Sequence, residues 1–302
     1  MKILRAQHLG MCFGVRDAIE LALKEAATHP LTVLGDLVHN ETVLADLRAR
    51  GIKVAQRAEA VDTRAVMVTA HGASQAALRR ARGYGFELTE ATCPLVLVAH
   101  QAVARLVAQG YHPVLVGKRD HVEVRGMTED LAEYDVVLSE EDVLALKERP
   151  RYGVAAQTTQ PIAKVRGLVE LLRQRFPASD VRFVDTVCRP TKERQNAAVE
   201  ISRQADAVVV IGGLHSNNTR ELVATCSRYC ARVHHVQTVA DLRPAWFNGV
   251  ATVGLTAGTS TPDQIIEDIH DWLATCASPR SQNPPETGAF APQPTLPELK
   301  AA

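Results

Sequence analysis

The chain has 302 residues, and 34 Lys and Arg residues balance 34 Asp and Glu residues, so its net charge is close to zero. This balance argues against a globally basic surface for nucleic acid, and no apolar run approaches the roughly 20 residues that cross a bilayer. The N-terminus lacks the apolar core of a signal peptide, so we expect a cytoplasmic protein whose six Cys residues are thiols rather than disulfides.

In the first third of the chain, two short apolar runs each end in a polar loop. Residues 31–34 precede the loop that carries His39, and residues 66–70 precede His71. A helical pattern opens just after Cys12. Short apolar runs that alternate with helical stretches predict βαβ units with parallel strands, in which ligands lie at the carboxyl ends of the strands.

The second third follows the same order. Cys93 ends the stretch 86–92 and again precedes a helical pattern. His121 and Glu123 follow the next apolar run, and Thr158 follows the one after it. In an extended segment, side chains two residues apart point to the same side, so we expect His121 and Glu123 to face one substrate.

The last third has its own cysteine, Cys188, before a third helical pattern. The two apolar runs that follow lead into four small polar residues, Ser216, Asn217, Asn218 and Ser260. Beyond Cys276 the composition shifts to Pro and Ser. Such segments bury too little apolar surface to fold, so we predict a disordered tail over residues 277–302.

The spacing of these features predicts three repeats of one architecture. The first polar loop follows its cysteine after 27, 28 and 28 residues: His39 after Cys12, His121 after Cys93 and Ser216 after Cys188. We therefore expect an α/β protein with three pseudo-equivalent domains of mostly parallel sheets, at residues 1–95, 96–190 and 191–276.

One thiol per repeat, at the same structural position, indicates a shared metal centre formed by Cys12, Cys93 and Cys188. The alternative is that each is a small buried core residue, but equal spacing and polar flanks do not fit core strands. Zinc sites usually pair their ligands within a few residues, and these cysteines have no near partner. A 4Fe–4S cluster normally takes four Cys ligands, so three would leave one iron open to act as a Lewis acid.

The remaining polar residues at strand ends are mostly hydrogen-bond donors. With glycine-rich turns and helix N-termini, they suit a phosphate or diphosphate group. Alone, each would more often be a loop residue without a ligand; the repeated position strengthens the set. The set comprises His39, His71, His121, Thr158, Ser216, Asn218 and Ser260. Glu123 is the carboxylate beside a histidine of this set, where it could deliver protons.

Eight motifs carry a resemblance to a known family: Gly10-Met-Cys12-Phe-Gly-Val-Arg-Asp-Ala, Gly35-Asp-Leu-Val-His39-Asn, Ala70-His71-Gly, Ala91-Thr-Cys93-Pro-Leu-Val, His121-Val-Glu123-Val, Gln157-Thr158-Thr, Asp185-Thr-Val-Cys188 and Thr256-Ala-Gly-Thr-Ser260. Several motifs in this order are highly specific. Over about residues 2–272, the chain resembles the IspH (LytB) family, the 4-hydroxy-3-methylbut-2-enyl diphosphate reductases of the methylerythritol phosphate isoprenoid pathway.

The resemblance implies a trefoil of three α/β domains around a central 4Fe–4S cluster, held by Cys12, Cys93 and Cys188 and keeping one open iron site. It implies that His121 and Thr158 orient an allylic diphosphate substrate. The groups that hold the diphosphate would be His39, His71, Ser216, Asn218 and Ser260, and the proton donor would be Glu123. The family removes the allylic hydroxyl with two electrons and two protons, giving isopentenyl and dimethylallyl diphosphate. It suggests reduced ferredoxin or flavodoxin as the electron donor.

Three segments depart from the family pattern. Arg189 and Pro190 follow the third cysteine where the family has Tyr-Ala. Asn217 replaces the middle serine of a Ser-Ser-Asn motif, so an amide stands where a hydroxyl would contact the diphosphate. The loop from Lys118 lacks a proline and adds Arg125 beside the acid motif. These changes leave the cluster ligands intact and bear on substrate choice.

Two other functions use the same residues. A non-redox hydro-lyase would use the open iron without a reductant, and its polar loops would bind carboxylates. An iron–sulfur sensor would signal by losing its cluster, and a change at Glu123 would then be silent.

Overall fold

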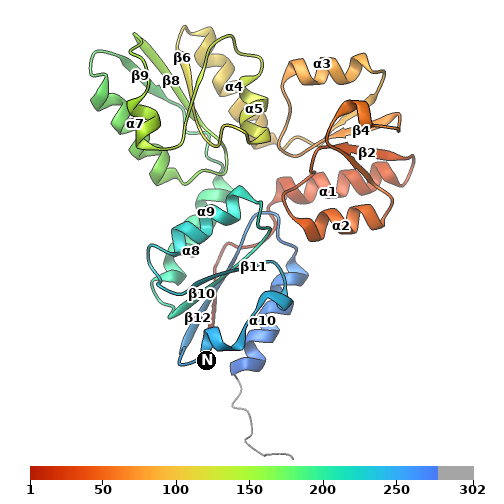
Figure 1. Cartoon of the computed structure of the whole chain (residues 1–302), viewed down its shortest axis with the longest axis vertical. Coiled ribbons are helices and arrows are strands. Elements are labelled where there is room, and N and C mark those ends of the chain that lie inside the picture. Colours follow the sequence, from red (N-terminus) through yellow and green to blue (C-terminus); the bar gives the residue numbers. More distant parts are fainter. Residues whose placement is uncertain (278–302) are drawn as a thin grey trace, which may run out of the picture.

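The computed structural model describes residues 1–277, which form three α/β units that meet at one point (Figure 1). Each unit contains a four-stranded sheet in which neighbouring strands are parallel. This confirms the prediction of three α/β units with parallel sheets. The predicted tail at 277–302 lies, apart from Ala277, outside the described residues.

The first unit contains the sheet β3-β2-β4-β5. Its strands are β2 (Leu31–Leu34), β3 (Lys53–Ala55), β4 (Ala65–Val68) and β5 (Glu87–Glu90). Its helices are α1 (Phe13–Ala26), α2 (Glu41–Ala49), α3 (Gln75–Gly83) and the short 3₁₀ helix η1 (Ala58–Ala60). Side-chain caps begin two of them, because Asn40 accepts hydrogen bonds at the start of α2 and Ser74 at the start of α3.

The second unit contains the sheet β7-β6-β8-β9. Its strands are β6 (His112–Val116), β7 (Asp135–Val137), β8 (Arg151–Ala156) and β9 (Asp180–Phe183). Its helices are α4 (Pro94–Ala108), α5 (Val122–Thr128), α6 (Glu140–Leu144) and α7 (Ile162–Arg175). Proline at the first position of α4 suits a helix start, because that residue's N–H has no partner within the helix.

The third unit contains the sheet β1-β12-β10-β11. Its strands are β1 (Lys2–Arg5), β10 (Ala207–Ile211), β11 (Val233–Val236) and β12 (Thr252–Ala257). Its helices are α8 (Arg189–Ser202), α9 (Asn217–Cys226), α10 (Asp263–Ala277) and the 3₁₀ helices η2 (Val239–Asp241) and η3 (Pro244–Phe247). Among residues 1–277, no helix is both long and apolar enough to cross a membrane.

The sheets of the second and third units are buried on both faces, as expected for parallel strands covered by helices. In β6, Val114 and Val116 pack into one apolar cluster and Leu115 into another on the opposite face. In β10, Val209 and Val208 divide between two clusters in the same way. Rigid central strands therefore support the loops at their carboxyl ends, where the predicted site residues lie.

The predicted boundaries of the first repeat, 1–95, include the N-terminal strand. In the structure this strand belongs to the sheet of the third unit. β1 pairs with β12 of the third unit, with Ile3 opposite Val253, and Ile3 packs against the third unit's core. The chain then crosses to the first unit near Gly10, whose φ of 75° favours glycine and whose Cα lies against Ile266. The other boundaries, 95/96 and 190/191, stay predictions.

The first and second units are joined by acids at the end of α5. Asp130 accepts hydrogen bonds from the backbone N–H groups of Gln75 (2.6 Å) and Ala76 (2.8 Å) at the start of α3. Glu129 accepts from the hydroxyl of Ser74 and pairs with an arginine of α3. Negative charge at a helix N-terminus is stabilising, so this contact fixes the two strand-end loops that contribute histidines relative to each other.

Candidate active site

The three cysteines of the predicted metal centre occupy equivalent positions. Cys12, Cys93 and Cys188 are the N-cap residues of α1, α4 and α8, and all three are partly buried. Their backbone N–H groups donate to carbonyls of the strand-end loops, each at 3.0 Å: Cys12 to Thr259, Cys93 to Ala70 and Cys188 to Thr158. One contact is thus repeated three times, as expected for three repeats of one architecture.

The thiols converge on the centre of the trefoil. A side chain at Gly14 of α1 would put its Cβ 2.5 Å from Sγ of Cys93, so only glycine lets α1 approach this thiol. The charge of Cys12 acts on both Cys93 and Cys188. Burial raises the pKa of Cys93 and raises that of Cys188 to about 11. Without a metal these two thiols are protonated at neutral pH, so metal binding would release protons.

Arg194 is a buried cation beside these thiols. Its guanidinium donates two hydrogen bonds to the carbonyl of Gly10, at 3.0 and 2.6 Å, and the side chain is 7% exposed. Burial lowers its pKa, while the charges of Cys12 and Cys188 act to raise it. A cation in this position offsets the negative charge of metal-bound thiolates.

An iron–sulfur cluster fits this donor set. Soft thiolates select iron–sulfur clusters among protein ligands, and the three thiols sit at helix N-termini, where a negative group is stabilised. Among residues 1–277, no three His, Cys, Asp or Glu side chains are grouped to hold a single metal ion.

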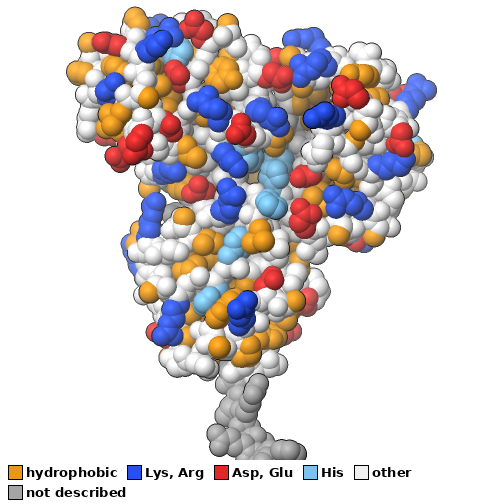
Figure 2. All heavy atoms as spheres, in the orientation of Figure 1, with side chains coloured by type: hydrophobic (Ala, Val, Ile, Leu, Met, Phe, Trp, Pro, Cys, Tyr) orange, Lys and Arg blue, Asp and Glu red, His pale blue; other side chains and the backbone are white. Residues whose placement is uncertain are grey.

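Three histidines pack against one another beside the thiols. The ring centroids of His39 and His71 are 4.3 Å apart, and that of His121 lies 5.2 and 5.6 Å from them. Figure 2 shows histidine side chains at the junction of the three units, with Lys and Arg side chains beside them. Burial lowers the pKa of His39, lowers that of His71 further and lowers that of His121 to about 3. The three histidines are therefore neutral at pH 7.

The geometry of His121 and Glu123 differs from the expected extended segment. His121 is the N-cap of α5, and its Nδ1 accepts a hydrogen bond from the backbone N–H of Glu123 at 3.2 Å. Glu123 lies in the first turn of the helix, so a helical rather than an extended backbone relates the two side chains. The bond at Nδ1 leaves Nε2 of His121 as the donor available to a ligand.

Glu123 is a buried carboxyl group with a shifted pKa. It is 1% exposed, and the backbone N–H of Thr158 donates to its Oε1 at 2.6 Å. Burial raises its pKa to about 7, although the hydrogen bonds from Thr158 act in the opposite direction. A carboxyl group with a pKa near neutrality can both hold and release a proton at physiological pH.

The third unit contributes hydroxyl and amide groups. Ser216 is the N-cap of α9, and Ser260 donates to the carbonyl of His39 at 3.4 Å. Asn217 donates to the hydroxyl of Thr159 at 3.3 Å, which joins the third unit to the second. Oδ1 of Asn218 accepts from a backbone N–H, but its buried Nδ2 has no partner among the described residues, and neither has Nε2 of His39. Buried donors without partners indicate a place for an acceptor ligand.

These groups line one small cavity of about 50 Å³. Its lining is Val15, Val38, His39, His71, His121, Glu123, Thr159, Ser216, Asn217, Asn218, Thr259 and Ser260. Of the predicted catalytic and substrate-binding residues, Thr158 alone is not in the lining, and it contacts the cavity through Glu123. The sequence analysis missed the lining residues Val15, Val38, Thr159 and Thr259. The Thr158-Thr159 pair at a strand end was the available signal for one of them.

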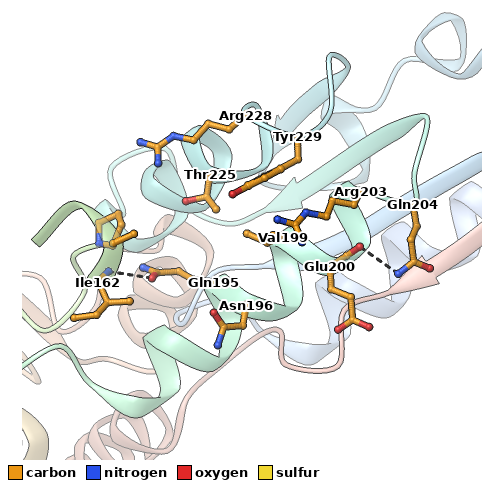
Figure 3. Close-up of a pocket in the computed structure, with 12 residues that line it drawn as sticks. Ile162, Gln195, Asn196, Val199, Glu200, Arg203, Gln204, Thr225, Arg228 and Tyr229 are labelled. Carbon is orange, nitrogen blue, oxygen red and sulfur yellow. Dashed lines mark hydrogen bonds between the residues drawn. The ribbon is translucent and has the colours of Figure 1, made fainter. Parts of the chain in front are cut away.

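A larger cavity, of about 650 Å³, lies between the second and third units (Figure 3). Its wall is formed by the start of α7 and by α8 and α9, and Arg203, Arg228 and Tyr229 lie along it. Within its lining, Oε1 of Gln195 accepts a hydrogen bond from the backbone N–H of Ile162 at 3.4 Å. The cavity contains none of the predicted site residues, so cavity size does not locate the chemistry in this molecule.

The fold and the site define a class of protein: three parallel α/β units whose strand ends join a three-thiol centre to a buried pocket of histidines, hydroxyls and amides. A family model described as LytB protein matches residues 3–274. The chain therefore belongs to the LytB family, as the motifs predicted.

Relatives in this family are reductases by name. A 4-hydroxy-3-methylbut-2-enyl diphosphate reductase of Pelobacter propionicus is 36% identical over 271 residues, which cover 89% of this chain and 96% of the relative. The reductase of an Anaeromyxobacter species is 37% identical and covers 90% of this chain and 97% of its own length. Both alignments span nearly the entire relative.

Solved structures give the same result. The E-1-hydroxy-2-methyl-but-2-enyl-4-diphosphate reductase of Plasmodium falciparum superimposes with a TM-score of 0.84 at 26% identity, over 98% of this chain and 95% of that chain. A structure of (E)-4-hydroxy-3-methyl-but-2-enyl diphosphate reductase, titled the terminal enzyme of the non-mevalonate pathway, gives a TM-score of 0.66 at 31% identity. That match covers 91% of this chain and 100% of the other. The trefoil arrangement agrees with both.

Proposed function

We infer that the protein reduces 4-hydroxy-3-methylbut-2-enyl diphosphate to isopentenyl and dimethylallyl diphosphate, the last step of the methylerythritol phosphate pathway. Family membership and the reductase relatives support this activity. The observation that carries the chemistry is the place of Glu123, a buried acid of raised pKa in a cavity lined by three histidines. Nothing in the structure favours a hydro-lyase or a sensor.

The diphosphate group is bound by neutral donors from two units. His39 and His71 come from the first unit, and the hydroxyl and amide groups come from the third: Ser216, Asn217, Asn218 and Ser260. The unpartnered Nε2 of His39 and Nδ2 of Asn218 support this assignment, because phosphate oxygens are acceptors for both. Binding would also favour protonation of the histidines, since an opposite charge within a few ångströms raises a histidine pKa.

His121, Thr158 and Glu123 act at the hydroxyl end of the substrate. Nδ1 of His121 is occupied by the N–H of Glu123, so Nε2 is left to orient the substrate. The backbone N–H of Thr158 fixes the carboxyl group of Glu123. With a pKa of about 7, Glu123 carries a proton in about half of the molecules at neutral pH. It delivers this proton to the leaving hydroxyl, which departs as water.

The thiols of Cys12, Cys93 and Cys188 would hold one 4Fe–4S cluster, and three protein ligands would leave one iron open. When bound, the cluster supplies electrons and a Lewis acid for the substrate oxygen. Arg194 holds the loop at Gly10 and places positive charge beside the thiolates. The two electrons and two protons consumed per turnover balance the loss of the hydroxyl as water and the new C–H bond of the product.

Reduced ferredoxin or flavodoxin is the proposed electron donor, and the cytoplasm is the proposed compartment. The test of the function is anaerobic turnover. Cluster-reconstituted protein, 4-hydroxy-3-methylbut-2-enyl diphosphate and a reduced viologen are mixed, and dye oxidation and both five-carbon diphosphate products are measured. Product that depends on the reductant supports the proposal. A full cluster with no product, or with product formed equally well without reductant, would refute it.

A further inference from the structure

We propose that Lys118 and Arg125 form a cationic entrance to the histidine cavity and capture the diphosphate group before the histidines bind it. This inference rests on the proposed function for its substrate, and it assigns a role to the segment where this chain departs from the family motifs. Three features of the structure carry it: the fixed backbone of each residue, the lack of acidic ion-pair partners and the lack of positive charge on the histidines of the cavity.

Lys118 is anchored by the turn that presents His121. Its backbone N–H donates to Oε1 of Gln157 at 3.1 Å, and its carbonyl accepts from the N–H of His121 at 2.9 Å. The preceding Gly117 is tightly packed, because a Cβ there would lie 2.8 Å from Val124 and 2.9 Å from Gln157. The backbone is therefore fixed, while the Lys118 side chain is exposed. The exposed side chain of Lys118 therefore starts from a fixed backbone position three residues before His121.

Arg125 lies one helical turn beyond His121 on α5. Its backbone N–H donates to the carbonyl of His121 at 2.9 Å, and its side chain is exposed. It lines a groove of about 460 Å³ between the first and second units, together with Gly72 and Val122. These two residues directly follow His71 and His121 in the sequence, so the groove runs alongside the wall of the histidine cavity.

Neither cation is neutralised by a neighbour. Within residues 1–277, Lys118 and Arg125 form no ion pair with an acid, whereas Arg80 in the same groove pairs with Glu129 at 2.6 Å. The charge of Lys118 lowers the pKa of both His39 and His121, and the charge of Arg125 lowers that of His121. Both cations therefore act on the cavity. The charge of Asp36 acts in the opposite direction and raises the pKa of His39.

The histidines, hydroxyls and amides of the cavity offer dipoles rather than positive charge to an arriving anion. Its three histidines are neutral before binding, so the long-range attraction for a diphosphate must come from fixed cations outside. Exposed charges act over about 10 Å at 0.1 M salt. Clefts lined by charge of one sign raise association rates by tenfold or more, and the effect falls steeply with ionic strength. The entrance is thus expected to affect capture more than the chemical step.

The test uses the full-length, cluster-reconstituted chain with Lys118→Gln and Arg125→Gln combined. The steady-state constants are measured with reduced viologen at low and at physiological ionic strength. At low ionic strength we expect kcat/KM to fall about tenfold and kcat to stay within about twofold. The variant should also lose most of the salt dependence of kcat/KM. Calorimetric binding of inorganic pyrophosphate gives a second readout that needs no turnover.

Matched changes that remove one positive charge each, on other helices, serve as controls. Arg48→Gln on α2 and Arg166→Gln on α7 remove exposed cations that form no ion pair among the described residues, and kcat/KM should hardly change. Lys118→Arg with Arg125→Lys should restore capture, because the charge is kept. Unchanged kcat/KM, salt dependence and pyrophosphate affinity in the Gln variant would overturn the proposal. If the wild type binds pyrophosphate through these residues but does not turn over, the proposed function fails and the entrance stands.

Discussion

The cysteine centre and the histidine cavity lie side by side, but only the first is symmetric. Each cysteine is a helix N-cap, and each donates its N–H to a strand-end carbonyl at the same distance of 3.0 Å. Equivalent positions in three repeats thus supply three equivalent thiols. The symmetry of the centre follows directly from the repeated architecture.

The histidine cavity uses the same strand ends without repeating their chemistry. The first unit provides His39 and His71, and the second provides His121 and Glu123. The third unit provides only hydroxyls and amides. A substrate with a diphosphate at one end and a hydroxyl at the other is itself asymmetric, so its binding groups cannot be threefold. The repeated architecture thus determines where the functional side chains lie. Sequence divergence of the loops determines which residue types lie there.

The largest effect is expected from removing one of the three equivalent cysteines. In Cys188→Ala, two thiols remain for a cluster that needs at least three, so we expect loss of most iron and sulfide and of all measurable turnover. Iron content and the visible absorption of the reconstituted protein check this. Cys276→Ala is the control, because that thiol is exposed and lies at the C-terminal end of α10. Full iron content in Cys188→Ala would show that the centre is assembled differently.

The second-largest effect is expected from a change in the histidine cavity alone. Glu123→Gln keeps the size of the side chain but removes its proton, so kcat should fall about 10²–10⁴-fold while the iron content stays unchanged. Since burial raises the pKa of Glu123 to about 7, the wild-type kcat should decline as pH rises above 7, where the acid form is lost. The variant should lack this decline. Glu148→Gln, an exposed change in the same unit, should retain both rate and profile.

Symmetric features were the easier ones to predict from sequence. The positions of Cys12, Cys93 and Cys188 after short strands, with a helix following each, predicted three α/β units and one shared centre. The structure shows the three units, and the shared metal centre stays a prediction. The spacing of the cysteines could not predict which sheet contains β1, because a strand near the N-terminus can pair with any sheet. Its partner, β12, lies about 250 residues away in the sequence.

The asymmetric features depend on contacts that no local pattern reveals. His121 and Glu123 were expected on an extended segment, but α5 begins between them, capped by the imidazole of His121 rather than by a hydroxyl or carboxylate. The neutrality of the histidines follows from burial among three units, which the sequence cannot measure. Arg194 is buried against Gly10, 184 positions away, so its role beside the thiols appears only in the fold.

A third prediction concerns the charge state of the cavity. Burial lowers the histidine pKa values below 6.5, so the free protein binds fewer protons there than the complex with an anion. Pyrophosphate affinity should therefore rise severalfold as pH falls from 8 to 6, with net proton uptake. Calorimetry in buffers of different ionisation enthalpy measures the uptake. His71→Asn should weaken binding about tenfold and reduce the uptake. An uptake of zero at every pH would contradict the neutral-histidine interpretation.

The smallest effect is expected at Asn217, where this chain carries an amide in place of the family's serine. Its Nδ2 donates to Thr159 at 3.3 Å and so connects the third unit to the second. Asn217→Ser shortens the side chain beyond reach of Thr159, and one hydrogen bond contributes about 1 kcal/mol to stability. We expect KM to change less than about threefold, and the unfolding midpoint in urea to fall slightly.

A double-mutant cycle with Thr159→Val separates the two roles of Asn217. If the amide serves mainly to join the units, the two changes should be non-additive in stability by about 0.5–1 kcal/mol, since each removes the same bond. If the amide serves mainly to hold the diphosphate, the stability effects will add and KM will respond to Asn217→Ser alone. The first result would mean that this loop has exchanged a ligand group for a structural contact, so even the asymmetric cavity retains groups that act on the fold rather than on the substrate.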